Sequence, residues 1–367
     1  MSEIKVNSIK GVGASAAAIT VNNTDGTCTA NITNNLSNRN LIINGAMQVA
    51  QRGTSSTTSG YYTLDRFALV YGGTDEAPTQ AQADVAAGTT PYTLGFRKAF
   101  KITNGNQTGG AGAADFIWFR YLFEAADIAN SGWNYTSTSS YVTLSFWVKS
   151  SVAQTFKGYL RSRDGTEQRY AFETGSLSAD TWTKVTKTIP GNSNLTFDNN
   201  VDQGLQLNIL GFMGTDYSDN SVTENAWAAY ASGTRLKDNT STWYTTNNAT
   251  LEITGVQLEV DQTGSGVATD FEHRSYAQEL ALCERYYEVC EGGLTVYGTS
   301  GTYHGVQVNF STKKRASPTV TRISDTLASN VNTPFAEYQS TRCFRATAQS
   351  TAAFCIYQTV YSAASEL

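Results

Sequence analysis

The chain has 367 residues and a formal net charge of −5, and charged residues make up 16% of it, against about 25% in a typical soluble protein. The length favours more than one domain and is sufficient for a sizeable core. The negative charge argues against a nucleic-acid-binding protein, which would normally carry a basic face. Only two histidines occur, which excludes a histidine-rich metal site, and 11% aromatic residues argue against disorder.

Residues 1–38 alternate loosely between apolar and polar positions, as at Ile4 and Val6, and are rich in Asn and Thr. They contain too few apolar residues for a core of their own. We expect an arm that docks onto another protein by strand addition, and the alternative is a frayed tail. The weak apolar run at 11–19 does not resemble a secretory signal, because it lacks Leu and Phe and follows Glu3. We therefore expect synthesis in a cytoplasm, without membrane insertion.

Residues 39–274 are typical of a β protein. The run Val142–Lys149 alternates cleanly, which predicts that Val142, Leu144, Phe146 and Val148 face a core. The apolar phase of 251–260 slips at Gly255, which indicates a β-bulge. Many short strands separated by turns favour a jelly roll or β-sandwich. We expect strands at 41–43, 62–71, 96–102, 116–123, 142–149, 156–161, 168–172, 181–189, 204–212 and 251–260.

One helix is expected after this body. Ser275 and Gln278 fit a capping box, and Gly292 and Gly293 are expected to end the helix. Strands then return at 294–297, 305–310, 319–323, 343–346 and 354–360. The sequence thus predicts an all-β protein with a jelly-roll or β-sandwich body at 39–274, a connecting helix at 275–293 and a small C-terminal β domain at 294–367.

Several segments carry a resemblance to a known family. They form five groups, namely Asn40–Gly53 with Asp65-Arg66-Phe67, then Ser145–Ser151, Val256–Glu259 with Ala268–Arg274, Cys283–Tyr287, and Arg315–Val320. In this order they resemble phage tail fibres and related virion appendage proteins, notably those of cyanophages and other marine phages. The match spans roughly residues 38–325.

The resemblance implies a central domain like a carbohydrate-binding-module jelly roll. It also implies a structural protein of the virion, usually a homotrimer, that attaches the particle to host surface polysaccharide or lipopolysaccharide. Residues 1–38 would dock it to other tail or adaptor proteins, although this segment matches the family only in general style. The family pattern carries no catalytic residue that can be transferred to this chain.

Sugar binding calls for exposed aromatic rings with short polar side chains beside them. The alternative for each ring is packing in a core or a subunit interface. A histidine expected in the turn 301–305 is added as a receptor contact, although a solvated turn histidine is the plainer interpretation. The candidates are Trp133, Tyr135, Trp147, Trp227, Tyr230, Trp243, Tyr244 and His304.

No nucleophile motif and no phosphate-binding loop occurs in the sequence, and its pairs of acids show no sign of tuning. We therefore expect no enzyme, no metal and no cofactor. Two alternatives to host attachment stay open, namely an adaptor or decoration protein that binds no ligand, and a glycan-cleaving tailspike. Cys343 and Cys355 could face each other across a hairpin as a disulfide, or be small buried residues.

Overall fold

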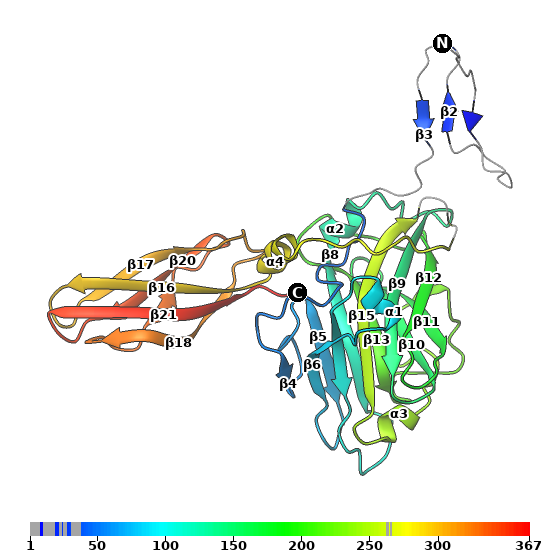
Figure 1. The fold of residues 1–367 in the computed structure, drawn as a ribbon, viewed down its shortest axis with the longest axis horizontal. Helices are drawn as coiled ribbons and strands as arrows, with labels where there is room; N and C mark the ends of the chain where they lie inside the picture. The colour runs from blue at the N-terminus through cyan, green and yellow to red at the C-terminus, as the bar shows by residue number, and fades with distance from the viewer. Residues whose placement is uncertain are drawn as a thin grey trace.

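Two β-sandwiches of unequal size make up most of the chain (Figure 1). The computed structural model describes residues 8–9, 19–21, 24, 28–30, 38–261, 264 and 266–367. A small separate sheet contains β1 (Ser8–Ile9), β2 (Ile19–Val21) and β3 (Cys28–Ala30). Most of residues 1–38 lie outside the described residues, so the docking role expected for them stays a prediction. The protein is all-β, with several antiparallel sheets, as the sequence predicts.

The larger sandwich consists of two six-stranded sheets. The first sheet has the order β14-β11-β10-β13-β8-β5, and the second has the order β12-β9-β15-β7-β6-β4. The strands of the first sheet are β5 (Phe67–Gly72), β8 (Phe116–Glu124), β10 (Thr155–Ser162), β11 (Gln168–Ser176), β13 (Gln203–Met213) and β14 (Trp227–Ala229). Those of the second are β4 (Ser55–Ser56), β6 (Thr79–Asp84), β7 (Lys98–Thr103), β9 (Tyr141–Ser150), β12 (Thr183–Pro190) and β15 (Thr250–Asp261).

The main core lies between these two sheets. Val142, Leu144, Phe146 and Val148 are fully buried there, which confirms the face predicted from their alternation. The bulge at Gly255 is also confirmed: the pairing of β15 with β9 shifts between Thr254 and Gln257, and Gly255 has a φ of +62° that glycine adopts without strain. Three short helices join strands, namely α1 (Thr90–Thr93), α2 (Ala125–Ala129) and α3 (Thr242–Thr245).

Helix α4 (Tyr276–Glu284) follows the larger sandwich, and its predicted capping box between Ser275 and Gln278 is confirmed. Its predicted end is wrong. The helix stops at Glu284, and β16 (Tyr287–Tyr297) runs through Gly292 and Gly293. Gly292 is needed there for packing, because a Cβ would lie 2.6 Å from Val308 and 2.8 Å from Ala346 in the facing sheet. The strand predicted at 41–43 is also wrong, since residues 41–42 are irregular and 43 begins a turn, and side chains bond the backbone N–H groups of Ile42 and Ile43.

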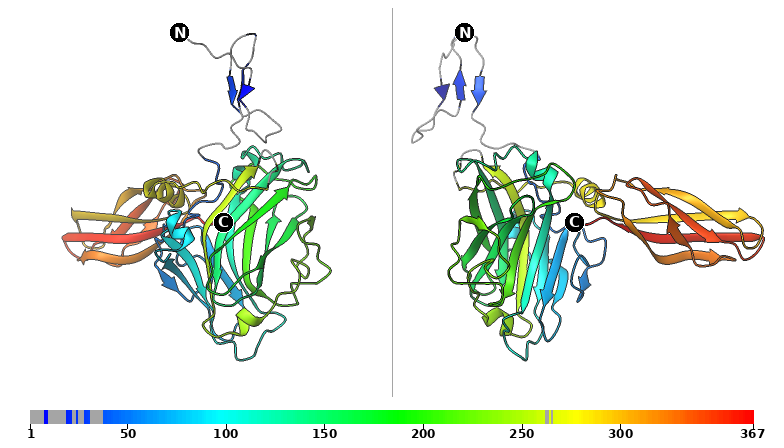
Figure 2. Two further views of the ribbon diagram at one scale, coloured as in Figure 1. Left: turned by 45° about the vertical axis from the view of Figure 1, so that its right-hand side comes forward. Right: turned by 180° about the vertical axis from the view of Figure 1, so that it is seen from behind.

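The smaller, C-terminal sandwich packs sheet β16-β21-β18 against sheet β17-β20-β19. Its strands, besides β16, are β17 (Tyr303–Asn309), β18 (Thr319–Ser329), β19 (Phe335–Glu337), β20 (Cys343–Gln349) and β21 (Phe354–Ala364). Figure 2 shows it projecting from one side of the larger sandwich, with α4 at the joint. Cys343 and Cys355 lie in different sheets and are free thiols. Among the described residues, no helix is long and apolar enough to span a membrane.

Candidate functional site

Three of the predicted sugar-binding aromatic residues are core residues. Trp133, Trp243 and Tyr244 are only 3%, 0% and 1% exposed. The indole N–H of Trp133 donates to the Ser140 carbonyl, and that of Trp243 donates to the Thr250 carbonyl, so their polar edges are satisfied within the chain. The expectation that these three rings stack on sugars is therefore wrong, because the sandwich itself covers both faces of each ring.

Tyr135, Trp227 and Trp147 are half-buried, and the first two lie near residues 190–192, where the Asn192 N–H donates to the Tyr135 carbonyl over 2.7 Å. Tyr135 and Trp227 pack against the main core, and the Trp227 indole donates to the Pro190 carbonyl over 2.7 Å. Trp147 points outward from the second sheet and packs against a small cluster that includes Phe96. Tyr135 and Trp227 therefore lie near one segment, whereas Trp147 belongs to a different cluster.

His304 lies in strand β17, in the smaller domain, where the sequence predicted a turn. Its ring rests against Gly298, where an added Cβ would lie 2.6 Å from His304 Nε2. Nε2 itself is buried without a hydrogen-bond partner. The predicted turn is therefore wrong, because His304 belongs to a strand, and its contact with a receptor stays a prediction.

Tyr230 lies on a surface that combines rings and polar groups. Its ring stacks on the guanidinium of Arg161, whose Cζ is 3.5 Å from the ring centroid. Both pack over the outer face of the first sheet, together with a second cluster of apolar residues centred on Trp118 and Tyr159. This outer face, formed by β5, β8, β13, β10 and β11, is the candidate site.

The strand register shows which side chains share this face. One row across the sheet contains Arg120, Asn208, Tyr159 and Ala171. The next row contains Leu122, Gln206, Arg161 and Arg169. Because side chains alternate between the two faces of a strand, all of these point away from the main core. The face thus brings guanidinium, amide and hydroxyl groups side by side, and Asn208, Tyr159 and Arg169 are buried there.

A long segment after β13 folds over part of this face. Tyr217, Val222 and Leu236 from this segment pack against the apolar cluster on the sheet. Arg235 belongs to the same segment, and its Cζ lies 4.7 Å from the ring centroid of Tyr217 and 5.8 Å from that of Trp118. Burial raises the pKa of Tyr159 to about 12, so its hydroxyl stays protonated at neutral pH and keeps its capacity to donate.

Several polar atoms on this face lack a partner within the described part of the chain. Trp118 Nε1, Arg120 Nε and Arg169 Nη1 are buried and accept or donate no hydrogen bond. Buried polar groups in folded proteins are normally satisfied, so unsatisfied donors gathered on one face call for an explanation. Each of the three is a donor, and a ligand rich in oxygen acceptors would satisfy them.

The charges on the face are only partly balanced. Arg161 and Arg163 both pair with Glu167, and Lys157 pairs with Glu173 and Glu224. Among the described residues, Arg120, Arg169 and Arg235 have no carboxylate within 4.0 Å. Burial lowers the pKa of Arg169.

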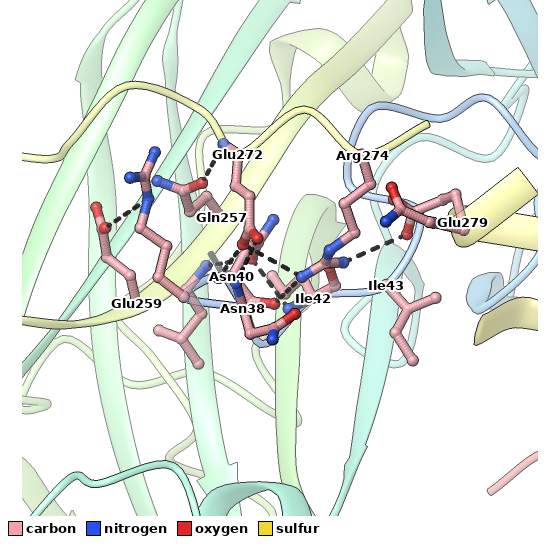
Figure 3. Close-up of polar contacts among 12 residues, drawn as sticks. Asn38, Asn40, Ile42, Ile43, Gln257, Glu259, Glu272, Arg274 and Glu279 are labelled. Atoms are coloured by element: carbon pink, nitrogen blue, oxygen red, sulfur yellow. Dashed lines mark hydrogen bonds and ion pairs between the residues drawn. The ribbon is translucent and has the colours of Figure 1, made fainter. Parts of the chain in front are cut away.

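The segments that carry the family resemblance have a structural role instead. The carboxylate of Glu272 accepts the backbone N–H groups of Asn38 and Asn40, over 2.6 and 2.7 Å (Figure 3). Arg274 donates to the carbonyls of Asn40 and Ile42. The Asn40 side chain is bonded in turn to the backbone of β15. These motifs therefore join the start of the larger sandwich to its last strand.

A shallow pocket of about 200 Å³ lies at the end of β13, between residues 111–113 and 212–218. Two of its polar groups are joined, since Ser218 Oγ donates to Asp238 over 2.8 Å, and Asp238 also accepts from Asn220 outside the pocket. No three His, Cys, Asp or Glu side chains within the described ranges gather in a way that could hold a metal ion.

No family model matches the sequence, and no curated protein matches it. Among solved structures, the chain is similar to the enzymatically active domain of tailspike protein 4 of bacteriophage CBA120, with 13% identity and a TM-score of 0.31 over 60% of this chain. It spans 21% of that tailspike chain. A structure described as a CBM4 module has 13% identity and a TM-score of 0.30, covering 60% of this chain and 99% of the module.

A third similar structure is the CBM22-1 xylan-binding domain of Paenibacillus barcinonensis Xyn10C. It has 10% identity and a TM-score of 0.29, and covers 61% of this chain and 95% of that domain. The sandwich architecture of the present chain is established by its own strand order and register.

Sequence reasoning missed Trp118, Arg120, Arg169 and Arg235. The run 116–123 is apolar on both faces of its strand, so alternation could not show which face is outward. One signal was available. Arg120 interrupts this apolar run, and its side chain lies on the same face of the strand as that of Trp118, two residues earlier. The position of Arg235 follows only from the path of its segment over the sheet.

Proposed function

We propose that this protein is a structural component of a phage virion that attaches the particle to glycan on the host surface. The observation that carries the proposal is the outer face of the first sheet, where buried donors without partners lie near the half-buried Tyr230 ring stacked on Arg161. Sugars offer hydroxyl oxygens to such donors and apolar ring faces to aromatic side chains. The sequence resemblance to phage appendage proteins supports the virion setting.

A glycan array with the purified full-length chain tests the binding. Tyr230→Ala removes a half-buried ring from the face, and Tyr62→Ala is the matched control because Tyr62 is 46% exposed elsewhere on the sandwich. We expect array signals that Tyr230→Ala weakens by about tenfold, the scale of one lost aromatic contact, and that Tyr62→Ala leaves unchanged. An array without any signal contradicts glycan recognition and favours the adaptor role.

We also propose assembly of several copies, most simply a homotrimer. The smaller domain supports this, because large apolar side chains are exposed along it, including Ile323 at 51%, Leu327 at 45% and Tyr297 at 79%. Packing against identical chains would cover them, and several copies raise avidity for a surface glycan without new contacts. Light scattering coupled to size exclusion measures the mass in solution, and a clean monomer contradicts the assembly.

The proposed protein binds glycan without cleaving it. Incubation of the purified protein with host polysaccharide tests this, with reducing ends as the readout. We expect no increase over a heat-denatured sample, and an accumulation of reducing ends would show a tailspike activity instead. Virions made with a chain lacking residues 1–38 test the docking arm, since we expect those particles to lack the protein while the free chain still binds glycan.

A further inference from the structure

Cationic groups on the candidate face outnumber the carboxylates that face them. Arg120, Arg169 and Arg235 have no ion-pair partner among the described residues, in a chain whose formal net charge is −5. Several other arginines of the larger sandwich do form ion pairs, as Arg161 does with Glu167. The face therefore carries an excess of positive charge.

Arg169 is the strongest single observation. Arg169 is 6% exposed, and its Nε donates to the Thr234 carbonyl over 2.6 Å. Its Nη1 is buried and has no partner. A buried cation without a counterion is costly to a folded protein, and an anionic ligand group would offset this cost. A guanidinium also matches the two oxygens of a carboxylate with parallel hydrogen bonds.

The spacing of the arginines indicates a chain-like ligand. Arg120 lies on β8 and Arg169 on β11, with β13 and β10 between them. Adjacent strands are about 4.8 Å apart, so the two backbones are roughly 14 Å apart. A chain-like ligand with carboxylates on separate sugars can span this distance. Asn208 and Gln206 lie between the two arginines, and both are buried, with Gln206 Nε2 donating to Asn208 Oδ1 over 2.6 Å.

We infer that the ligand is an acidic polysaccharide whose sugars carry carboxylate groups, with Arg120 and Arg169 binding separate carboxylates along it. This inference rests on the proposed glycan-binding function and specifies its ligand class. Arg235, held over the rings of Tyr217 and Trp118, contributes positive charge between the two ends of the face.

The test is native affinity electrophoresis of the full-length protein in gels containing alginate, polygalacturonate or hyaluronate, each compared with its carboxyl-reduced form. We expect at least one acidic polysaccharide to retard the protein and its reduced form to lose this effect. Arg120→Gln and Arg169→Gln should each weaken binding by about tenfold or more, the scale of one charged hydrogen bond. Arg342→Gln is the control, because it makes the same charge change at an exposed site in the other domain.

The outcomes separate the two levels of the proposal. Equal binding of acidic and reduced forms, weakened by Tyr230→Ala, would overturn the acidic ligand and leave glycan binding intact. Binding of neither form, with an empty glycan array, would overturn both. An equal loss of binding with Arg342→Gln would show non-specific attraction and overturn the inference. A fall in oligomeric mass with Arg120→Gln would also overturn it, because the face would then belong to contacts between copies. Arg120→Gln is informative even if Arg169→Gln fails to fold, since Arg120 is half-exposed.

Discussion

Arg285 holds Glu124 through two parallel hydrogen bonds of 2.7 Å, and the two residues are 161 positions apart. Arg285 follows helix α4, whereas Glu124 ends strand β8 of the larger sandwich. The hydroxyl of Tyr286 donates to the same carboxylate over 2.6 Å. This cluster attaches the smaller domain to the larger sandwich.

Glu124→Gln should weaken this joint. Glu124 is 2% exposed, and the substitution removes the negative charge to which Arg285 and Tyr286 donate. We expect the free energy of unfolding to fall by about 2 kcal/mol, typical of a charged hydrogen bond. Thermal unfolding and the rate of proteolysis next to α4 measure the effect. Asp84→Asn is the control, since its pair with Lys98 is exposed and should contribute less than about 1 kcal/mol. Equal effects of both variants would argue against the joint.

Lys314 and Glu288 form a buried ion pair at the base of the smaller domain, with 2.6 Å between Nζ and Oε2. Lys314→Met or Glu288→Leu alone leaves one charge buried without its partner, so each should cost about 3–5 kcal/mol. The double variant should cost clearly less than the sum of the two. A double-mutant cycle from thermal unfolding measures the coupling, and strict additivity would contradict it.

Asp65 predicts a pH dependence of stability. Burial raises the pKa of this carboxyl to about 6, against 3.8 for an unperturbed aspartate, although the nearby Arg52 lowers it. The folded state therefore binds the proton more tightly than the unfolded state. The contribution to stability is fully present below pH 3.8 and is lost as the pH rises through about 6.

Melting temperatures between pH 4 and 7 test this dependence. We expect the melting temperature of Asp65→Asn to fall less with rising pH over this range, which lies roughly between the unperturbed and the raised pKa of Asp65. The exposed Asp84→Asn variant should leave the decline as it is in the unmodified protein. A decline that is equally steep in Asp65→Asn would show that another group causes it.

Asn40 closes the larger sandwich. Its Oδ1 accepts the N–H groups of Ile42 and Leu258, and its Nδ2 donates to the Val256 carbonyl (Figure 3). Asn40→Ala leaves these buried backbone groups unsatisfied, so we expect a loss of about 3 kcal/mol. Chemical denaturation measures it, with Asn134→Ala in an exposed turn as the control. A loss no larger than that of the control would mean that this network does not stabilise the fold.

Local patterns determined much of the secondary structure. The alternation of Val142–Val148, the capping box of Ser275 and the bulge at Gly255 each depend on residues close in sequence, and all three are confirmed. The end of the helix was predicted wrongly at Gly292, because a glycine that stops a helix and a glycine that admits a facing sheet look alike in sequence.

The candidate site could not be derived in the same way. Trp133, Trp243 and Tyr244 have polar neighbours in sequence, and only the packing of distant strands shows that they belong to the core. Trp118 and Arg169 belong to one face because four strands pair in a particular order, and Arg235 joins them because its segment folds across the sheet.

By itself, the sequence determined that this protein is a polar, weakly charged β protein with one capped helix, since composition and period act over short distances. Only the tertiary structure decided which aromatic rings are covered and which arginines are left without counterions. Burial and charge pairing depend on residues that are far apart in the chain and meet only when the sheets close.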